Sequence, residues 1–172
     1  GAFACCNNLT EITIPAGVTA IGSGPFGFCA ELKAIQVESG NTEYVSVDGV
    51  LYSADGKTLI QFPGGFADGY SIPEGVTAIG PEAFSGSSFL TEMDIPESVT
   101  VIADGAFDGC TALTRITLPD GLTEIAPFTF ESCFALSHIR IPEGVTAIGE
   151  GAFSNCTGLI SVKLPGSVGT IG

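Results

Sequence analysis

A unit of 23 residues repeats along this chain and constrains its fold more than any other feature. Residues 113–135 and 136–158 align without a gap, as LTRITLPDGLTEIAPFTFESCFA and LSHIRIPEGVTAIGEGAFSNCTG. A fixed period of this length is typical of solenoid proteins, in which one repeat is one coil that cannot bury its apolar side chains alone. The sequence therefore predicts a stack of coils rather than a domain around one central core.

One step between repeats is longer than the others. The leucine of the repeat recurs at Leu9, Leu32, Leu90, Leu113, Leu136 and Leu159. All steps are 23 residues except the second, which is 58 and so exceeds two repeats by 12 residues. We predict one solenoid domain over residues 1–172, with a longer irregular repeat at about 38–69. Both ends of the chain fall within a repeat, so we expect it to be a piece of a longer array.

Each part of the repeat has a local structure that its residues favour. Leu-x-x-Ile-x-Ile places apolar side chains two residues apart, which is the period of a β-strand. The proline that follows lacks an N–H and ends the strand, and Ile-Pro-Glu-Gly suits a type I turn. Val-Thr-x-Ile predicts a second short strand, and Gly-x-x-Ala-Phe-x-x-Cys predicts a single helical or 3-10 turn. Stacking would bury the Leu, Ile, Val, Phe and Cys positions as columns.

The irregular repeat lacks the second half of this pattern. In its place are two β-prone runs, at residues 50–52 and 58–61, on either side of Ser-Ala-Asp-Gly-Lys. This arrangement predicts a β-hairpin with a five-residue loop. Asp48-Gly49 predicts another tight turn just before it.

The chain is acidic, with 19 Asp and Glu against five Lys and Arg, and its net charge is −14. Nucleic-acid binding needs a basic surface, and so does docking on anionic lipid. No apolar run approaches the ~18–20 residues of a transmembrane helix, and no signal-peptide pattern opens the chain. We therefore expect no nucleic-acid partner and no membrane insertion by this segment.

The pattern L-x-x-I-x-I-P-x-x-V-x-x-I-x-x-x-A-F-x-x-C, at this period, resembles the BspA-like leucine-rich repeat family. Residues 41–63, N-x-x-Y-x-x-x-D-G-V-L-Y-S-x-D-x-K-T-L-I-x-F-P, also resemble a segment that recurs in that family. The resemblance implies a right-handed leucine-rich-repeat solenoid with a parallel β-sheet on its concave face. It also implies an extracellular or cell-surface protein of host-associated bacteria or some protozoa, of which some members take part in adhesion. The family shares no catalytic residues.

The cysteines leave three alternatives: disulfides, a metal site or buried thiols. Five of the six occupy one column of the repeat: Cys6, Cys29, Cys110, Cys133 and Cys156. Zinc sites use short spacings such as Cys-x-x-Cys, which are absent. Stacked side chains would also point in parallel into the core. We predict reduced thiols that pack as small apolar groups and no metal site; whether Cys5 and Cys6 form a disulfide stays open.

His138 is the only histidine, and nothing in the sequence pairs it with a nucleophile. A catalytic triad needs a placed Ser or Cys and an acid, and the chain has no G-x-S-x-G motif. Asp48-Gly49 and Asp55-Gly56 suit turns better than calcium, because the EF-hand spacing is absent. We predict that the protein is not an enzyme and holds no cofactor.

The strand positions that alternate with the isoleucines are predicted to face outward on the concave sheet. In four successive repeats they gather three of the five basic residues, the histidine and two acids: Glu92, Asp94, Arg115, His138, Arg140 and Lys163. One interpretation is a recognition surface for a polar or acidic partner, steered by charge. The other is surface ion pairing, such as Asp94 with Arg115, which contributes little.

Two functions fit these features. The first is a non-enzymatic adhesion or protein-interaction module that binds a host or microbial protein or glycan, either through the concave sheet or through the insert at residues 41–68, and acts as a monomer. The second is a structural stalk or spacer with no ligand of its own. The exposed strand residues differ from repeat to repeat, which favours the first, whereas the uniform core pattern suits either.

Overall fold

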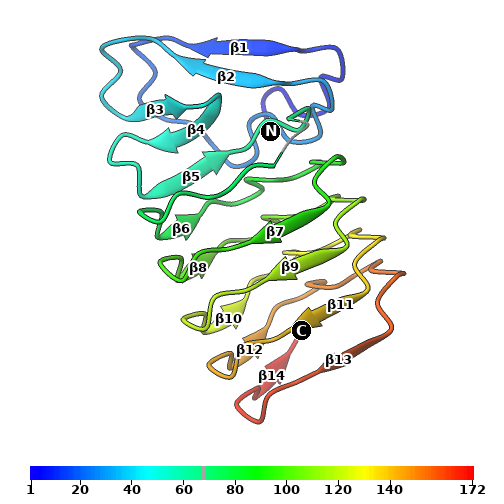
Figure 1. Ribbon diagram of the computed structural model, residues 1–172. Coiled ribbons are helices and arrows are strands. Elements are labelled where there is room, and N and C mark those ends of the chain that lie inside the picture. The colour runs from blue at the N-terminus through cyan, green and yellow to red at the C-terminus, as the bar shows by residue number, and fades with distance from the viewer. Residues whose placement is uncertain (67–68) are drawn as a thin grey trace.

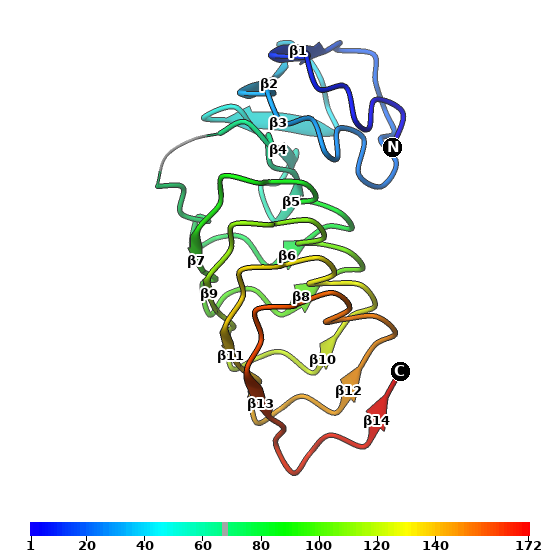
Figure 2. The same cartoon turned by 90° about the vertical axis from the view of Figure 1, so that its right-hand side faces the viewer.

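The computed structural model describes residues 1–66 and 69–172, which form a solenoid of stacked coils (Figure 1). The first strands of successive coils follow one another along one side: β1 (Glu11–Ile14), β2 (Ala34–Val37), β7 (Glu92–Asp94), β9 (Arg115–Thr117), β11 (His138–Arg140) and β13 (Ser161–Lys163). The second strands follow one another along another side: β6 (Ala78–Ile79), β8 (Val101–Ile102), β10 (Glu124–Ile125), β12 (Ala147–Ile148) and β14 (Thr170–Ile171). Figure 2 shows the two rows separately, with β1 at one end of the stack and β14 at the other.

Neighbouring coils pair as parallel strands in the register that the repeat predicts. Glu92 lies opposite Arg115, and Glu124 lies opposite Ala147, each pair one repeat apart. In β7, β9 and β11 the middle residue is buried and both neighbours are exposed. This alternation is the one expected for Leu-x-x-Ile-x-Ile, and the predicted parallel solenoid is confirmed.

The third side of each coil differs from the prediction, because residues 1–66 and 69–172 contain no helix. Alternate N–H groups, at Gly105, Phe107 and Gly109, donate to carbonyl oxygens of the next coil at 2.8–2.9 Å. The N–H groups between them close turns within their own coil. A helix would direct every N–H back along its own coil, so the predicted helical or 3-10 turn is wrong.

Phenylalanine rings form a continuous stack through the interior. Neighbouring ring centroids lie 4.8–5.6 Å apart along the series Phe62, Phe84, Phe107, Phe130 and Phe153. Such offset pairs add about 0.5–1.5 kcal/mol each beyond the burial of their surface. The repeat predicts this column, except for Phe62, which joins it from within the irregular repeat.

The buried cysteines form a second column beside the rings. The Sγ atoms of Cys110, Cys133 and Cys156 each donate to the carbonyl oxygen of the phenylalanine one coil earlier, at 3.0–3.3 Å. These thiols are free, as predicted, and burial raises their pKa. Cys5 and Cys6 are free as well and lie exposed.

The irregular repeat folds as an antiparallel meander of β3 (Tyr44–Val47), β4 (Val50–Ser53) and β5 (Thr58–Gln61). The predicted hairpin is confirmed, although its loop has four residues because Ser53 belongs to β4, and β3 was not predicted. Asp48 and Gly49 form the other turn, with φ of 50° and 81°. A Cβ at position 49 would lie 3.1 Å from the Cβ of Ala34, so both backbone and space favour glycine there.

The meander supplies a second-row strand for its own coil, since β5 pairs in parallel with β6. It does not restore the core, which splits into an N-terminal and a larger C-terminal cluster of buried side chains. Gln61 joins the two: its Oε1 accepts the N–H of Phe26 at 3.4 Å, and its Nε2 donates to the carbonyl of Ala83 at 3.1 Å. The Gln61 side chain is fully buried, so a polar side chain bridges the break in the stack.

Ser87 stands where other coils have a cysteine, and its buried hydroxyl has no hydrogen-bond partner among the described residues. A buried, unpaired polar group lowers the free energy of unfolding by about 1–3 kcal/mol.

We therefore expect Ser87→Cys to raise the free energy of unfolding by about 1 kcal/mol in urea titrations. The reciprocal change Cys133→Ser should lower it, because it introduces a hydroxyl into a site built for sulfur; a destabilising Ser87→Cys would contradict this account.

Candidate functional site

The outward side chains of β7, β9, β11 and β13 lie in register along one side of the solenoid. We call this surface the ladder face, and it consists of Glu92, Asp94, Arg115, Thr117, His138, Arg140, Ser161 and Lys163. All of these side chains are exposed, whereas Met93, Ile116 and Ile139 between them are buried. The six residues that the sequence singled out therefore share one surface.

Arg115 holds the acidic end of the ladder face together. Its guanidinium contacts Glu92 Oε2 and Asp94 Oδ1, both at 2.8 Å. Thr117 completes the cluster, because its hydroxyl donates to Asp94 Oδ1 at 2.6 Å. The hydrogen bonds from Arg115 and then Thr117 lower the pKa of the Asp94 carboxyl. The ion pairing considered from the sequence is present, and it leaves this end with one net negative charge at neutral pH.

The other end of the ladder face is basic. Arg140 turns toward the loop of the preceding coil, where its guanidinium contacts Asp120 Oδ1 at 2.7 Å. Lys163 lies directly opposite Arg140 in the strand pairing and makes no ion pair with any described residue. Both side chains line a hollow of about 320 Å³, together with Glu143. His138 bonds only locally among the described residues, from Nδ1 to the Ser137 hydroxyl at 3.1 Å.

The first-strand row is interrupted at the irregular repeat. The register of the repeat places a first strand at residues 69–71, but no strand forms there. Sheet pairing along this row therefore stops after β2 and resumes between β7 and β9, and it is absent again between β9 and β11. The predicted continuous sheet is therefore wrong at the irregular repeat, and it is also divided between β9 and β11.

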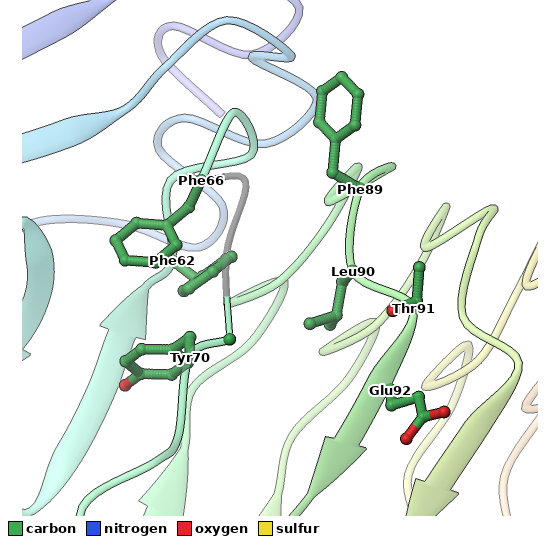
Figure 3. Close-up of a pocket in the computed structure, with 8 residues that line it drawn as sticks. Phe62, Phe66, Tyr70, Phe89, Leu90, Thr91 and Glu92 are labelled. Atoms are coloured by element: carbon green, nitrogen blue, oxygen red, sulfur yellow. The ribbon is translucent and has the colours of Figure 1, made fainter.

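A pocket of about 210 Å³ lies beside the irregular repeat (Figure 3). Phe62, Phe66 and Tyr70 line one side of it, and Leu90, Thr91 and Glu92 line the other. Phe89 projects from the end of the pocket away from Glu92, and its side chain is 55% exposed.

The hydroxyl of Tyr70 is hydrogen-bonded to that of Tyr52 and points away from the pocket (Figure 3). Burial raises the pKa of both hydroxyls above the ordinary range of tyrosine. Tyr70 therefore offers its ring, and not its oxygen, to whatever enters the pocket.

None of the aromatic pocket residues was singled out as a site from the sequence. The available signal was local: four aromatic side chains fall within residues 62–89 but outside the 23-residue register of the recurring phenylalanines. Their meeting depends on how the irregular repeat folds back, which its sequence does not specify.

Comparison with known proteins decides the family. A family model described as the BspA-type leucine-rich repeat region matches six copies, over residues 1–48 and 68–172. The chain belongs to the BspA-type leucine-rich repeat family. The predicted resemblance is confirmed.

Solved structures agree with this BspA-type assignment. The chain is 35% identical to a leucine-rich cell surface protein from Faecalibacterium prausnitzii, over 95% of this chain and 47% of that one, with a TM-score of 0.85. It is 29% identical to the pneumococcal vaccine antigen PcpA, over 99% and 44%, with a TM-score of 0.89. A leucine-rich repeat protein from Bacteroides ovatus is 30% identical, over 97% and 40%, with a TM-score of 0.67. The chain thus spans less than half the length of each of these proteins.

Comparison with curated proteins finds no match. Within residues 1–66 and 69–172 no helix is long and apolar enough to cross a membrane. The same residues contain no group of three or more His, Cys, Asp or Glu side chains that could hold a metal ion.

This BspA-type solenoid carries a second charged surface. It lies on the third side of the coils, the side without strands, which we call the corner. Glu82, Asp108 and Glu131, from three successive coils, line a shared hollow there. Burial, and then the charges of Glu131 and Glu82, raise the pKa of Asp108 to about 6. A carboxyl whose pKa is higher in the folded than in the unfolded state destabilises the fold fully at a pH above its folded pKa. This destabilisation disappears once the pH falls below the pKa of the carboxyl in the unfolded chain.

We therefore expect Asp108→Asn to raise the melting temperature at pH 7.5, by roughly 2 °C. The gain should shrink as the pH falls through 6 and vanish below about pH 3, where the wild-type carboxyl is protonated in both states. Thermal unfolding of both proteins at several pH values measures this. An equal gain at pH 4 and pH 7.5 would show that repulsion and burial of the charge are not the cause.

Proposed function

We propose that this protein is a non-enzymatic interaction module of a cell surface, and that it binds a protein or glycan partner through the ladder face. The partner lies on a host cell or on a neighbouring microbe, and the module acts as a monomer outside the cell. Neither nucleic acid nor a lipid bilayer is its target, as the net charge of −14 suggests.

The observation that carries this proposal is the contrast between the two faces of each first strand. The inward residue is always apolar, whereas the outward pair changes from Glu92 and Asp94, through Arg115 and Thr117, to His138 and Arg140. A spacer needs only a uniform soluble surface. An ordered change from acidic to basic along the stack is a pattern that a partner of complementary charge can read.

The similar proteins support a surface location. One of them is described as a cell surface protein and another as a vaccine antigen, and both share the fold over nearly all of this chain. Because the chain spans less than half of each, the activity of the whole protein is part of the proposal.

The basic end of the ladder face gives the sharpest test. The double variant Arg140→Glu with Lys163→Glu reverses two exposed charges and should weaken binding to an acidic partner group by tenfold or more, with a reduced dependence on salt. The measurement is surface plasmon resonance against a panel of purified extracellular matrix proteins and mucin glycans. Both substituted positions are exposed, so the fold should persist, which circular dichroism checks.

A matched control is available in the other two lysines. Lys33→Glu with Lys57→Glu makes the same change in net charge at exposed positions away from the ladder face, and its affinity should stay within about twofold of wild type. If both double variants lose affinity equally, only net charge matters. If the wild-type protein binds no member of the panel, the spacer function is favoured instead.

A further inference from the structure

The pocket beside the irregular repeat is concave and lined by aromatic side chains, unlike the charged ladder face next to it. Its volume of about 210 Å³ is below the ~300–1,000 Å³ of typical small-molecule sites. A space of this size suits a single side chain. Energetically dominant residues of protein interfaces are anchors of this kind, seated in a pocket near the centre of the contact.

Aromatic rings make up one wall of the pocket. Phe62 packs 4.9 Å from Tyr70 and 5.2 Å from Phe66, measured between ring centroids. Phe66 and Tyr70 are partly exposed, while Phe62 beneath them is buried. Ring faces attract cations through their quadrupole, and arginine uses this interaction more often than lysine because its planar guanidinium also stacks.

A carboxylate lies at the other wall. Glu92 uses its Oε2 to accept Arg115, whereas its Oε1 has no hydrogen bond with any described residue. The Glu92 side chain is 59% exposed, so Oε1 can take a second cation. The surrounding charge acts in the same direction, because the cluster of Glu92, Asp94 and Arg115 is net negative.

We propose that this pocket receives an arginine side chain of the partner protein, with the stem of the arginine against Phe66 and Tyr70 and its guanidinium at Glu92 Oε1. The inference rests on the proposed function and deepens it. The partner would present an arginine to the β7 end of the ladder face and acidic groups to the β13 end, so that the charge order sets one orientation of binding.

Alternative guests differ in chemistry. An apolar side chain would use the rings but gain nothing from Glu92. A sugar ring also stacks on aromatic side chains, and its hydroxyls could bond Thr91 and Glu92. The carboxylate and the negative surroundings favour the cation over both.

The test is a titration of the whole chain, uniformly labelled with ¹⁵N, with N-acetyl-L-arginine amide, followed in ¹H–¹⁵N spectra. The amide signals of Leu90, Thr91 and Glu92 should shift and saturate, with a dissociation constant on the order of millimolar. N-acetyl-L-leucine amide and methyl β-D-galactoside serve as apolar and sugar probes. Equal or tighter binding of either probe, or no saturable shift with the arginine probe, would overturn the proposal.

Two substitutions separate the two walls of the pocket. Phe66→Ala removes a partly exposed ring of the aromatic wall, and Glu92→Gln removes the charge of the other wall while Arg115 keeps its contact with Asp94. Each should weaken the arginine probe by about threefold to tenfold. Phe134→Ala is the matched control, since that ring is 47% exposed and lies outside the pocket. Unchanged affinity in both pocket variants would refute the assignment.

This experiment is independent of the proposed function. The double variant Arg140→Glu with Lys163→Glu should bind the arginine probe as wild type does, because neither residue lines the pocket. If the charge-reversal test of the ladder face fails but the probe still binds, the pocket stands and the basic end is not used. If the probe fails but charge reversal abolishes partner binding, only the pocket assignment falls.

Discussion

Hydrogen bonds between one coil and the next are the constraint on which the rest of the structure depends. On the corner side, every second N–H leaves its own coil, as at Phe107, whose N–H reaches the carbonyl of Thr129 at 2.9 Å. This geometry needs two residues of positive φ in each corner, such as Gly105 and Gly109. A backbone that alternates in this way cannot wind into a helix. Consequently the 23-residue spacing has to be kept from coil to coil, or the carbonyl acceptors are lost.

The irregular repeat shows what happens when the spacing is broken. The irregular coil contributes no corner. The N–H of Phe28, in the coil before it, therefore donates to the carbonyl oxygen of Ser85, in the coil after it. Gln61 and Phe62 fill the space that remains: the amide satisfies backbone groups on both sides, and the ring continues the phenylalanine stack. In the coil that follows, the hydroxyl of Ser87 is buried without a hydrogen-bond partner among the described residues. The two core clusters thus stay separate but are bridged by the Gln61 side chain, and on the surface the first-strand row stays open beside them.

The 23-residue period was sufficient to predict the structural features that recur in every regular coil. The two strands of each coil, their parallel register and the columns of phenylalanine and cysteine all follow from alternation and a fixed period, because each position meets its own copy in the next coil. The corner was mispredicted since Gly-x-x-Ala-Phe-x-x-Cys has helical spacing, and only contact with the next coil reveals that its N–H groups are needed elsewhere. The pocket was missed for a related reason: Phe66 and Glu92 belong to different coils and meet only through the irregular repeat.

The difference between the regular coils and the irregular repeat also bears on which residues can bind a partner. On the regular coils, charged side chains lie one strand spacing apart and neutralise one another, as Arg115 does with Glu92 and Asp94. Exposed pairs of this kind contribute little binding energy of their own, because a partner has to displace contacts that already exist. On the described ladder face, the Lys163 ammonium and the second oxygen of Glu92 escape this pairing. They lie on the same face, three coils apart and opposite in charge. A partner that engages both is held in one direction along the stack, and the aromatic wall beside Glu92 supplies the apolar contact that charge alone does not.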